Sequence, residues 1–344
     1  MNSTIALEVV LPGLVEPSGL ELRERRLPAP VAGELLVAVD ATGVSFAEQS
    51  MRRGRYFGQP AFPFVPGYDL VGTVVAAGSP DHASLVGSRV ASVTKTGGWA
   101  SHAIVAARDT VVVPRELDPA EIETVVVNGL TAWQMLHRSA RVMPGQTIVI
   151  HGVNGGVGGI LAQLARLDGI RVIGTASPRH HDALRAAGVE PVDYNDPRLL
   201  ERVLALAPEG VQAVFDNVGG RVVLDSWRML ARGGALVCYS IIADVSGDGP
   251  LLWPFLRAIG RNALWTLLPN GRRATFYDLW AGHSMRRRTF RRRLEQDLGA
   301  VVGLLADGSI SANIAARFPL TEAVAALELA ESRTVRGKIV LLPR

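Results

Sequence analysis

The glycine-rich stretch 151–158 (HGVNGGVG) has the residue types and spacing of a loop that binds an anion. An apolar run precedes it and an amphipathic run follows it, so we expect a turn from a strand at 147–151 into a helix at 156–168. Glycine lets a pyrophosphate approach the backbone, and the helix N-terminus offers free N–H groups and a positive dipole end. The stretch therefore predicts dinucleotide binding, and a loop with incidental glycines is the alternative.

The end of the next strand indicates which dinucleotide is bound. The expected strand at 171–176 runs into Ser177-Pro178-Arg179-His180, with no carboxylate before Asp182. Sites for NAD usually place Asp or Glu here to hold the ribose 2′-hydroxyl. Ser177 and Arg179 can instead bond a 2′-phosphate. The pattern favours NADPH, and a solvated arginine at a helix start is the alternative.

Two domains must position these residues. Residues 1–124 carry short β-type runs broken by Gly and Pro, which predict a mostly antiparallel β domain. From 125 onward strands alternate with helices, which predicts a doubly wound parallel sheet of the α/β class. The expected strands are 147–151, 171–176, 191–194, 212–217 and 235–240, and the expected helices are 156–168, 181–187, 197–206 and 221–231. A further helix is expected near 290–307.

Composition narrows the function classes. The chain has 344 residues, 48% hydrophobic and 20% charged, which fits a folded protein of two domains. The single cysteine, Cys238, lies in an apolar run and excludes an internal disulfide or a cysteine-based zinc cluster. The net charge of +4 comes without a basic, aromatic-rich stripe, so we expect no nucleic-acid binding. No signal peptide or spanning segment is expected, and the predicted location is the cytoplasm.

Several motifs in consistent order resemble the medium-chain dehydrogenase/reductase superfamily, in its zinc-independent quinone oxidoreductase (zeta-crystallin-like) branch. They are GELLVAVDATGVSFAE, RRGRY, FVPGYDLVGTVVAAG, NGLTAW, the glycine motif, VFDNVGG and GKIVLLP. The resemblance implies a GroES-like β domain from 1–124 and 285–344, a Rossmann domain at 125–284, and an active site in the cleft between them. It also implies a homodimer formed through a sixth Rossmann strand, ATFYDLW.

The resemblance implies a set of NADPH contacts along the Rossmann domain. These are Asn128, Thr131, Gly152, Asn154, Gly155, Gly156, Val157, Gly158, Ser177, Arg179, Tyr194, Asn217, Tyr239 and Ser240. Zinc-dependent relatives have Cys where this chain has Ser45, and His-Glu where it has Tyr68-Asp69. No catalytic metal is therefore expected.

Without a metal, conjugate reduction is the favoured chemistry. Hydride then goes to the β-carbon of an enone or quinone, and hydrogen-bond donors stabilise the resulting enolate. Tyr56 is the first candidate donor, with Ser45 second and Tyr68 third; a packing role for Tyr56 is the alternative. We expect Glu48 and His151 to be structural, each bonding nearby groups.

The segment 251–273, within a Trp- and Arg-rich region at 241–275, places apolar residues at helical spacing interrupted by Gly260. Six arginines follow within 286–293. Three interpretations remain open: a lid followed by a solvated charged helix, an entrance for a large apolar substrate, or contact with an anionic membrane surface or carrier protein.

The expected function is an NADPH-dependent, metal-free reductase of an activated C=C bond in an enone, quinone or enoyl compound of lipophilic character. The first alternative is a reductive cyclase of polyketide-type secondary metabolism, in which hydride addition triggers ring closure. A more remote alternative is a non-catalytic NADPH-binding protein.

Overall fold

The computed structural model describes residues 4–243 and 252–343. It divides into two compact units, one of Met1–Leu130 with Gly282–Arg344 and the other of Thr131–Ala281. The first division falls inside helix α2 (Pro119–Trp133), which a π-helical turn at Gln134–Ala140 continues. Part of the Trp- and Arg-rich region, 244–251, lies outside the described residues.

The first unit contains a seven-stranded sheet of order β14-β15-β3-β4-β5-β7, with β6 paired to β3. All neighbouring strands are antiparallel except β14 and β15. A separate antiparallel pair joins β1 and β2. The mostly antiparallel β fold predicted for this part of the protein is thereby confirmed. The strands are β1 (Ile5–Val10), β2 (Glu21–Arg26), β3 (Glu34–Val44), β4 (Asp69–Ala77), β5 (Arg89–Val93), β6 (His102–Ala106), β7 (Thr110–Val112), β14 (Ile314–Pro319) and β15 (Lys338–Leu342).

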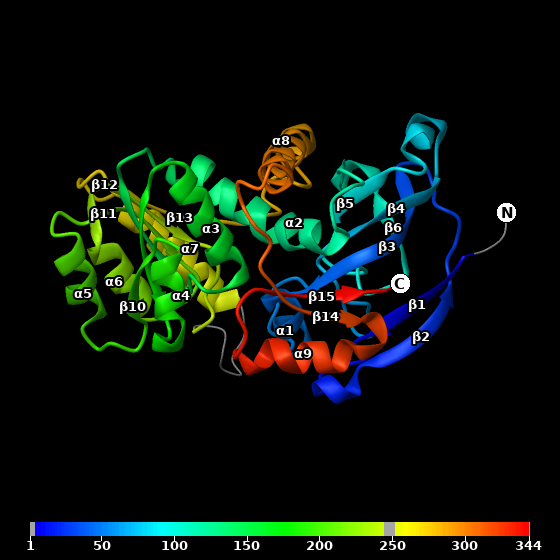
Figure 1. Cartoon of the computed structure of the whole chain (residues 1–344), viewed down its shortest axis with the longest axis horizontal. Helices are drawn as coiled ribbons and strands as arrows, with labels where there is room; N and C mark the ends of the chain where they lie inside the picture. Colours follow the sequence, from blue (N-terminus) through cyan, green and yellow to red (C-terminus); the bar gives the residue numbers. More distant parts are fainter. Residues whose placement is uncertain (1–3, 244–251, 344) are drawn as a thin grey trace. The chain divides into compact units, whose positions relative to one another are not determined.

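Besides the first part of α2, the described residues of this unit form the helices α1 (Phe46–Arg52), α8 (Arg287–Ala306) and α9 (Ala323–Ser332). Helix α9 lies against β14 and β15 (Figure 1), and its buried Leu327 shares an apolar core with Trp99 and Ile339. The Trp99 indole N–H also donates to the carbonyl of Gly43 at 2.9 Å. Short 3₁₀ turns occupy Pro17–Gly19, Pro80–Leu85, Ala107–Asp109 and Leu320–Glu322.

The second unit contains a six-stranded parallel sheet of order β10-β9-β8-β11-β12-β13 (Figure 1). The chain first adds strands on one side of β8 and then on the other, so the order reverses between β8 and β11. Ligands of such sheets bind at this reversal, outside the carboxyl ends of the strands. The doubly wound α/β fold is confirmed. The strands are β8 (Thr147–His151), β9 (Arg171–Ala176), β10 (Glu190–Asp193), β11 (Val211–Asp216), β12 (Leu230–Cys238) and β13 (Arg273–Phe276).

The helices of this unit connect the strands as the alternating pattern predicts. They are α3 (Gly156–Leu167), α4 (His181–Ala186), α5 (Leu199–Leu206), α6 (Val222–Arg228) and α7 (Leu252–Thr266), with a 3₁₀ turn at Pro178–His180. Val203 of α5 and Trp227 of α6 pack with sheet residues such as Val149 in one buried cluster. The helix expected at 221–231 ends earlier, because the chain already enters β12 at Leu230.

Helix α7 corrects one expectation, since it runs without a break through Gly260. A glycine in a helix interior costs only about 1 kcal/mol relative to alanine. Burial of Ala258 and packing of Phe255 on Phe276 of β13, with ring centroids 5.8 Å apart, outweigh that cost. Trp265 also stacks on Trp227 at 4.9 Å. Figure 1 shows α7 alongside β13.

Candidate functional site

The predicted cofactor residues of the sheet each follow the end of a parallel strand. Gly152 to Gly158 follow β8, Ser177 and Arg179 follow β9, Tyr194 follows β10, Asn217 follows β11, and Tyr239 and Ser240 follow β12. Because parallel strands end at the same edge, the fold brings these residues to one edge, on both sides of the reversal. Asn128 and Thr131, the remaining two, are buried on α2.

The turn between β8 and α3 needs glycine for two reasons. Gly152 has a φ of 64°, in the left-handed region. A Cβ on Gly158 would lie 2.5 Å from the carbonyl oxygen of Gly152 and 2.8 Å from Cα of Val153, which is a clash. Gly155 is the N-cap of α3 and makes no side-chain hydrogen bond, so the cap residue leaves the first N–H groups of the helix available to a ligand. Such a turn fits a pyrophosphate.

Asn217 gives a second, independent indication of a ligand. Its amide lies over the turn, since a Cβ on Gly152 would be 3.2 Å from Asn217 Nδ2. Its Oδ1 is buried and has no hydrogen-bond partner within the described part of the chain. A buried acceptor left without a donor is costly. The residues present therefore fit a dinucleotide that brings its own donors.

The end of β9 has the electrostatics expected for a 2′-phosphate. Arg179 is exposed, and its Nε lies 3.2 Å from Nε2 of His180. The nearest carboxylate in sequence, Asp182, is occupied by Arg185 at 2.7 Å. The region thus presents a cation and the Ser177 hydroxyl, while the carboxylate of Asp193, which is paired in register with Ala176 on the neighbouring strand, accepts from the Asn195 N–H at 3.0 Å.

Tyr56 and Tyr68, which the sequence offered as separate candidates, form a pair. Their phenol oxygens lie 2.7 Å apart, and their rings meet edge to face with centroids 5.9 Å apart. Tyr68 directly precedes β4 and is buried, whereas Tyr56 follows α1 and is half-buried. A phenol hydrogen-bonded to a second phenol can give up its proton at lower cost, because the second hydroxyl solvates the phenolate.

Ser45, the third candidate, is already engaged in capping α1. Its Oγ accepts from the Ala47 N–H at 3.1 Å and donates to Glu48 Oε2. Glu48 in turn accepts from the Ser45 N–H and the Tyr68 N–H, both at 2.8 Å. Burial raises the pKa of the Glu48 carboxyl. The structural role expected of Glu48 is confirmed, and the Ser45 hydroxyl is less available than the tyrosines.

A buried ion cluster beside this pair escaped the sequence analysis. Lys338 Nζ lies 3.0 Å from Glu123 Oε1 and 3.5 Å from Asp69 Oδ2, with all three side chains at most 3% exposed. Burial raises the pKa of Glu123 well above its usual range. Burial opposes the charge of Lys338, yet the surrounding carboxylates raise its pKa. The available signal was a lysine opening the apolar run KIVLL, in a chain with only one other lysine.

The other titratable candidates do not form a reactive or metal-binding centre. No group of three or more His, Cys, Asp or Glu side chains is arranged to hold a metal in residues 4–243 and 252–343. Cys238 is buried in β12, and burial together with Asp216 raises the pKa of its thiol to about 12, which keeps it protonated. His181 bonds the carbonyl of Ala176 at 3.1 Å.

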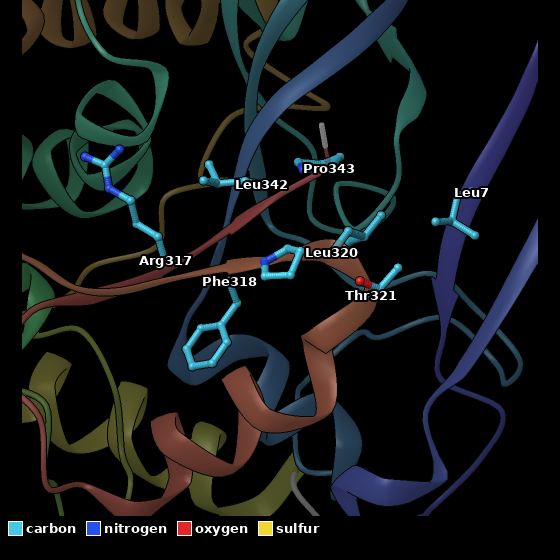
Figure 2. Close-up of a pocket in the computed structure, with 8 residues that line it drawn as sticks. Leu7, Arg317, Phe318, Leu320, Thr321, Leu342 and Pro343 are labelled. Atoms are coloured by element: carbon cyan, nitrogen blue, oxygen red, sulfur yellow. The ribbon is translucent and has the colours of Figure 1, made fainter.

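A cavity of about 370 Å³ opens in the first unit between side chains of β1, β14 and β15 (Figure 2). It is lined mostly by apolar groups, and its one charged side chain, Arg317, pairs with Asp118 at 2.5 Å. None of the predicted site residues lines it, so we assign it no role in the chemistry.

Family models match both units. The alcohol dehydrogenase GroES-like domain matches residues 31–115, and the zinc-binding dehydrogenase model matches residues 188–341. The human synaptic vesicle membrane protein VAT-1 homolog is 28% identical over 94% of this chain and 82% of its own length. The mouse homolog is 31% identical over a match that covers 66% of this chain and 57% of the mouse protein. Within the described residues, no helix combines the length and apolarity needed to cross a membrane.

A phthioceranic/hydroxyphthioceranic acid synthase of Mycobacterium tuberculosis is 30% identical over 99% of this chain, which covers only 15% of that protein. Among solved structures, a mycobacterial protein complexed with NADPH matches at 29% identity and a TM-score of 0.83 over 98% of this chain and 100% of its own. A mycobacterial quinone oxidoreductase matches at 28% identity and a TM-score of 0.82 over the same shares. The chain belongs to the medium-chain dehydrogenase/reductase superfamily, in its zinc-independent quinone oxidoreductase branch.

Proposed function

We propose that the protein is an NADPH-dependent reductase that delivers hydride to an activated C=C bond without a metal. The observation that carries this proposal is the glycine turn at the reversal of a parallel sheet, next to a β9 end that is followed by Ser177 and Arg179 and not by a carboxylate in the chain before Asp182. The match to a mycobacterial structure complexed with NADPH, at 29% identity over 98% of this chain, supports the choice of cofactor.

Each part of the cofactor has a group of this chain to hold it. The open N-terminus of α3 would bind the pyrophosphate, and Ser177 and Arg179 the 2′-phosphate. Asn217 would accept a hydrogen bond at its unpaired Oδ1. Bound NADPH supplies the hydride, so the protein itself must orient the acceptor and manage charge and protons.

The tyrosine pair is our proposal for the proton donor. Hydride addition to the β-carbon of an enone or quinone leaves negative charge on the substrate oxygen. The Tyr56 phenol would donate to that oxygen, and Tyr68, 2.7 Å away, would stabilise the phenolate as the proton leaves. Glu48 fixes the backbone of Tyr68 through its 2.8 Å bond to the N–H. Ser45 remains a weaker candidate, because its hydroxyl is already bonded on two sides.

The proposed substrate is an enone, quinone or enoyl compound of lipophilic character. The 28% identity to a mycobacterial quinone oxidoreductase supports a quinone. The 30% identity to a segment of an acid synthase is compatible with an enoyl compound, which carries the same activated C=C bond. The alternative is a reductive cyclase, in which the enolate attacks a second carbon of the same substrate. Reduction and cyclisation both add two hydrogens, so NMR of the product, counting rings, separates them.

The test is NADPH oxidation with a panel of acceptors. Purified protein is mixed with NADPH deuterated at C4 and with quinones, short and long enones, and enoyl thioesters. We expect loss of absorbance at the nicotinamide band and deuterium at the β-carbon of an accepted substrate. If no acceptor is reduced above background while NADPH still binds, the reductase proposal is wrong and the non-catalytic alternative holds.

We also propose that a second copy of the chain covers α7 and β13. Strand β13 ends the sheet and pairs only with β12 among the described strands. Helix α7 and the residues after it expose a contiguous set of large apolar side chains, which is unusual for a monomer. They are Leu252, Trp253, Leu256, Ile259, Leu264, Leu267 and Leu268. An unpaired strand edge beside an apolar helix favours pairing with an identical edge.

Light scattering after size exclusion tests the dimer. We expect twice the 36.7 kDa of the chain for wild type and a monomer for Leu264→Glu. The control Leu167→Glu changes another exposed leucine, on α3, and should stay dimeric. Monomeric wild type would overturn the proposal. Co-sedimentation of that monomer with anionic liposomes would assign α7 to a membrane surface instead, and binding to an acidic acyl carrier protein would assign it to such a carrier.

We propose the cytoplasm as the working compartment and a small molecule, not nucleic acid, as the partner. The single cysteine is free and buried, which fits a reducing environment. Cell fractionation with an antibody against the native protein would check this, and recovery in an extracytoplasmic fraction would contradict it.

A further inference from the structure

His151, the last residue of β8, is fully enclosed and lies between two hydroxyl groups. Its Nδ1 is 3.1 Å from Thr175 Oγ1 on β9, and its Nε2 is 3.0 Å from Ser226 Oγ on α6. All three side chains are at most 2% exposed. The reductase chemistry proposed above leaves this histidine without a task.

The direction of the hydrogen bonds follows from the acceptor at one end. Ser226 Oγ has two acceptors within reach, Asp216 Oδ2 at 2.7 Å and the Val222 carbonyl at 3.0 Å, and we assign its single proton to the closer, charged carboxylate. Ser226 can then accept from the Nε2–H of His151. Burial lowers the pKa of His151, against the opposing carboxylates of Asp216 and Asp225. We therefore assign a neutral ring with the proton on Nε2 and the lone pair on Nδ1.

The hydrogen bonds that link Thr175, His151, Ser226 and Asp216 end at two different loops. Thr175 Oγ1 donates to His151 Nδ1 and accepts from the Gly152 N–H at 3.2 Å, the first residue of the glycine turn. At the other end, Asp216 Oδ1 accepts from the N–H groups of Val218 and Gly219 at 2.8 and 2.9 Å. Asn217 belongs to the loop after β11 and lies over the turn after β8, and these are the strands between which the order reverses.

We infer that Thr175, His151, Ser226 and Asp216 form a positioning relay that holds both loops in the geometry that binds the dinucleotide. The inference rests on the proposed function, in that the ligand of these loops is NADPH. A glycine-rich turn has high backbone freedom, and ordering it only on binding would weaken affinity. The relay fixes Gly152, at a φ of 64°, and the 217–219 turn before the cofactor arrives.

The experiment replaces Thr175 with a residue of the same shape. Thr175→Val removes both the acceptor of Gly152 and the donor to His151, whereas Thr175→Ser keeps them. We expect Thr175→Val to weaken the Kd of NADPH and of NADH by the same factor, about tenfold. The kcat at saturating cofactor should stay unchanged, and Thr175→Ser should restore the affinity. His151→Gln, which keeps only the Ser226 side, should behave like Thr175→Val.

Hydrogen exchange on the free protein gives a readout that does not depend on the cofactor. Amides at 152–158 and 217–219 should exchange faster in Thr175→Val than in wild type. Thr110→Val is the matched control, because Thr110 Oγ1 is also buried and bonds Ala106 O at 3.0 Å and Ser92 Oγ at 3.2 Å in the other unit. It should lower stability without changing the Kd or the exchange at those amides.

Three results would overturn the relay: unchanged exchange at 152–158 in Thr175→Val, an unchanged Kd, or a loss for NADPH that NADH does not share. Wild-type protein that binds neither nucleotide would refute the proposed function. In that case the exchange data on the free protein would still decide whether the relay fixes the two loops.

Discussion

Replacing Lys338 with methionine would leave buried carboxylates without their cation. Lys338 Nζ lies 3.0 Å from Glu123 and 3.5 Å from Asp69, with 3% of its side chain exposed. Methionine keeps much of the volume of the lysine stem and removes the charge. The cluster joins β15, α2 and β4, so the change affects the frame from which Tyr68 extends.

The size of the effect follows from the burial of the pair. Removing one partner of a buried ion pair typically costs about 3–5 kcal/mol. Glu123 can relieve part of this by taking up a proton, since its pKa is already raised by burial. We therefore expect a loss near the lower limit, about 3 kcal/mol, which for a unit of this size lowers Tm by roughly 6–12 °C.

The pH dependence has a defined sign. Folding raises the pKa of Lys338, so its stabilising contribution is present below the unfolded value of 10.5 and is lost only as the pH rises beyond it. In Lys338→Met, the loss of stability comes from the carboxylates, which are buried without a cation in the folded state. In the unfolded state the same carboxylates ionise freely in water. Glu123, with a raised pKa, incurs that cost as the pH rises above 4.5. The deficit of the variant should thus be smaller at pH 5 than at pH 8.

Urea unfolding followed by circular dichroism measures these changes in the free energy of unfolding. Hydrogen exchange then shows whether the loss of stability lies in the first unit. Glu123→Gln serves as the partner variant, because Lys338 then keeps Asp69. The double variant Lys338→Met/Glu123→Gln should recover at least 1 kcal/mol of the loss, through removal of the unpaired carboxylate. A loss below about 1 kcal/mol in Lys338→Met, or an additive double variant, would refute the reasoning.

Four further outcomes are expected. Tyr56→Phe should lower kcat/KM by about 10²-fold with KM for NADPH unchanged, and a full-rate variant would remove Tyr56 as the donor. Gly158→Ala should abolish NADPH binding in fluorescence titration, because its Cβ would lie 2.5 Å from the Gly152 carbonyl; normal binding would show that the turn can open. Arg179→Ala should raise the KM for NADPH about tenfold and spare NADH, whereas equal effects would contradict the 2′-phosphate assignment. Atomic absorption should find no stoichiometric zinc in active protein, and activity that tracks added zinc would contradict the metal-free mechanism.

Local patterns predicted much of the architecture because they act over short distances. The strands expected at 147–151 and 171–176 coincide with β8 and β9, since apolar runs bounded by Gly or by a turn encode them directly. Helix ends were less accurate, as at 221–231, because Leu230 joins β12 through pairing with the distant β11 and β13. Gly260 was expected to interrupt α7, and packing on β13 decided otherwise.

The sequence alone determined the geometry of the glycine turn, because Gly152 and Gly158 decide the backbone by residue type at single positions. In the same way, the residue types at Ser45 and Tyr68 predict that metal donors are absent. Tertiary structure decided which distant side chains cooperate. Lys338 contacts Asp69, which is 269 residues away in the sequence, and His151 contacts Ser226, which is 75 residues away. No periodic pattern of residue types along the chain predicts contacts at such separations. These contacts form only in the folded protein. Folding buries the charges and hydroxyls, and buried polar groups need hydrogen-bond or ion-pair partners.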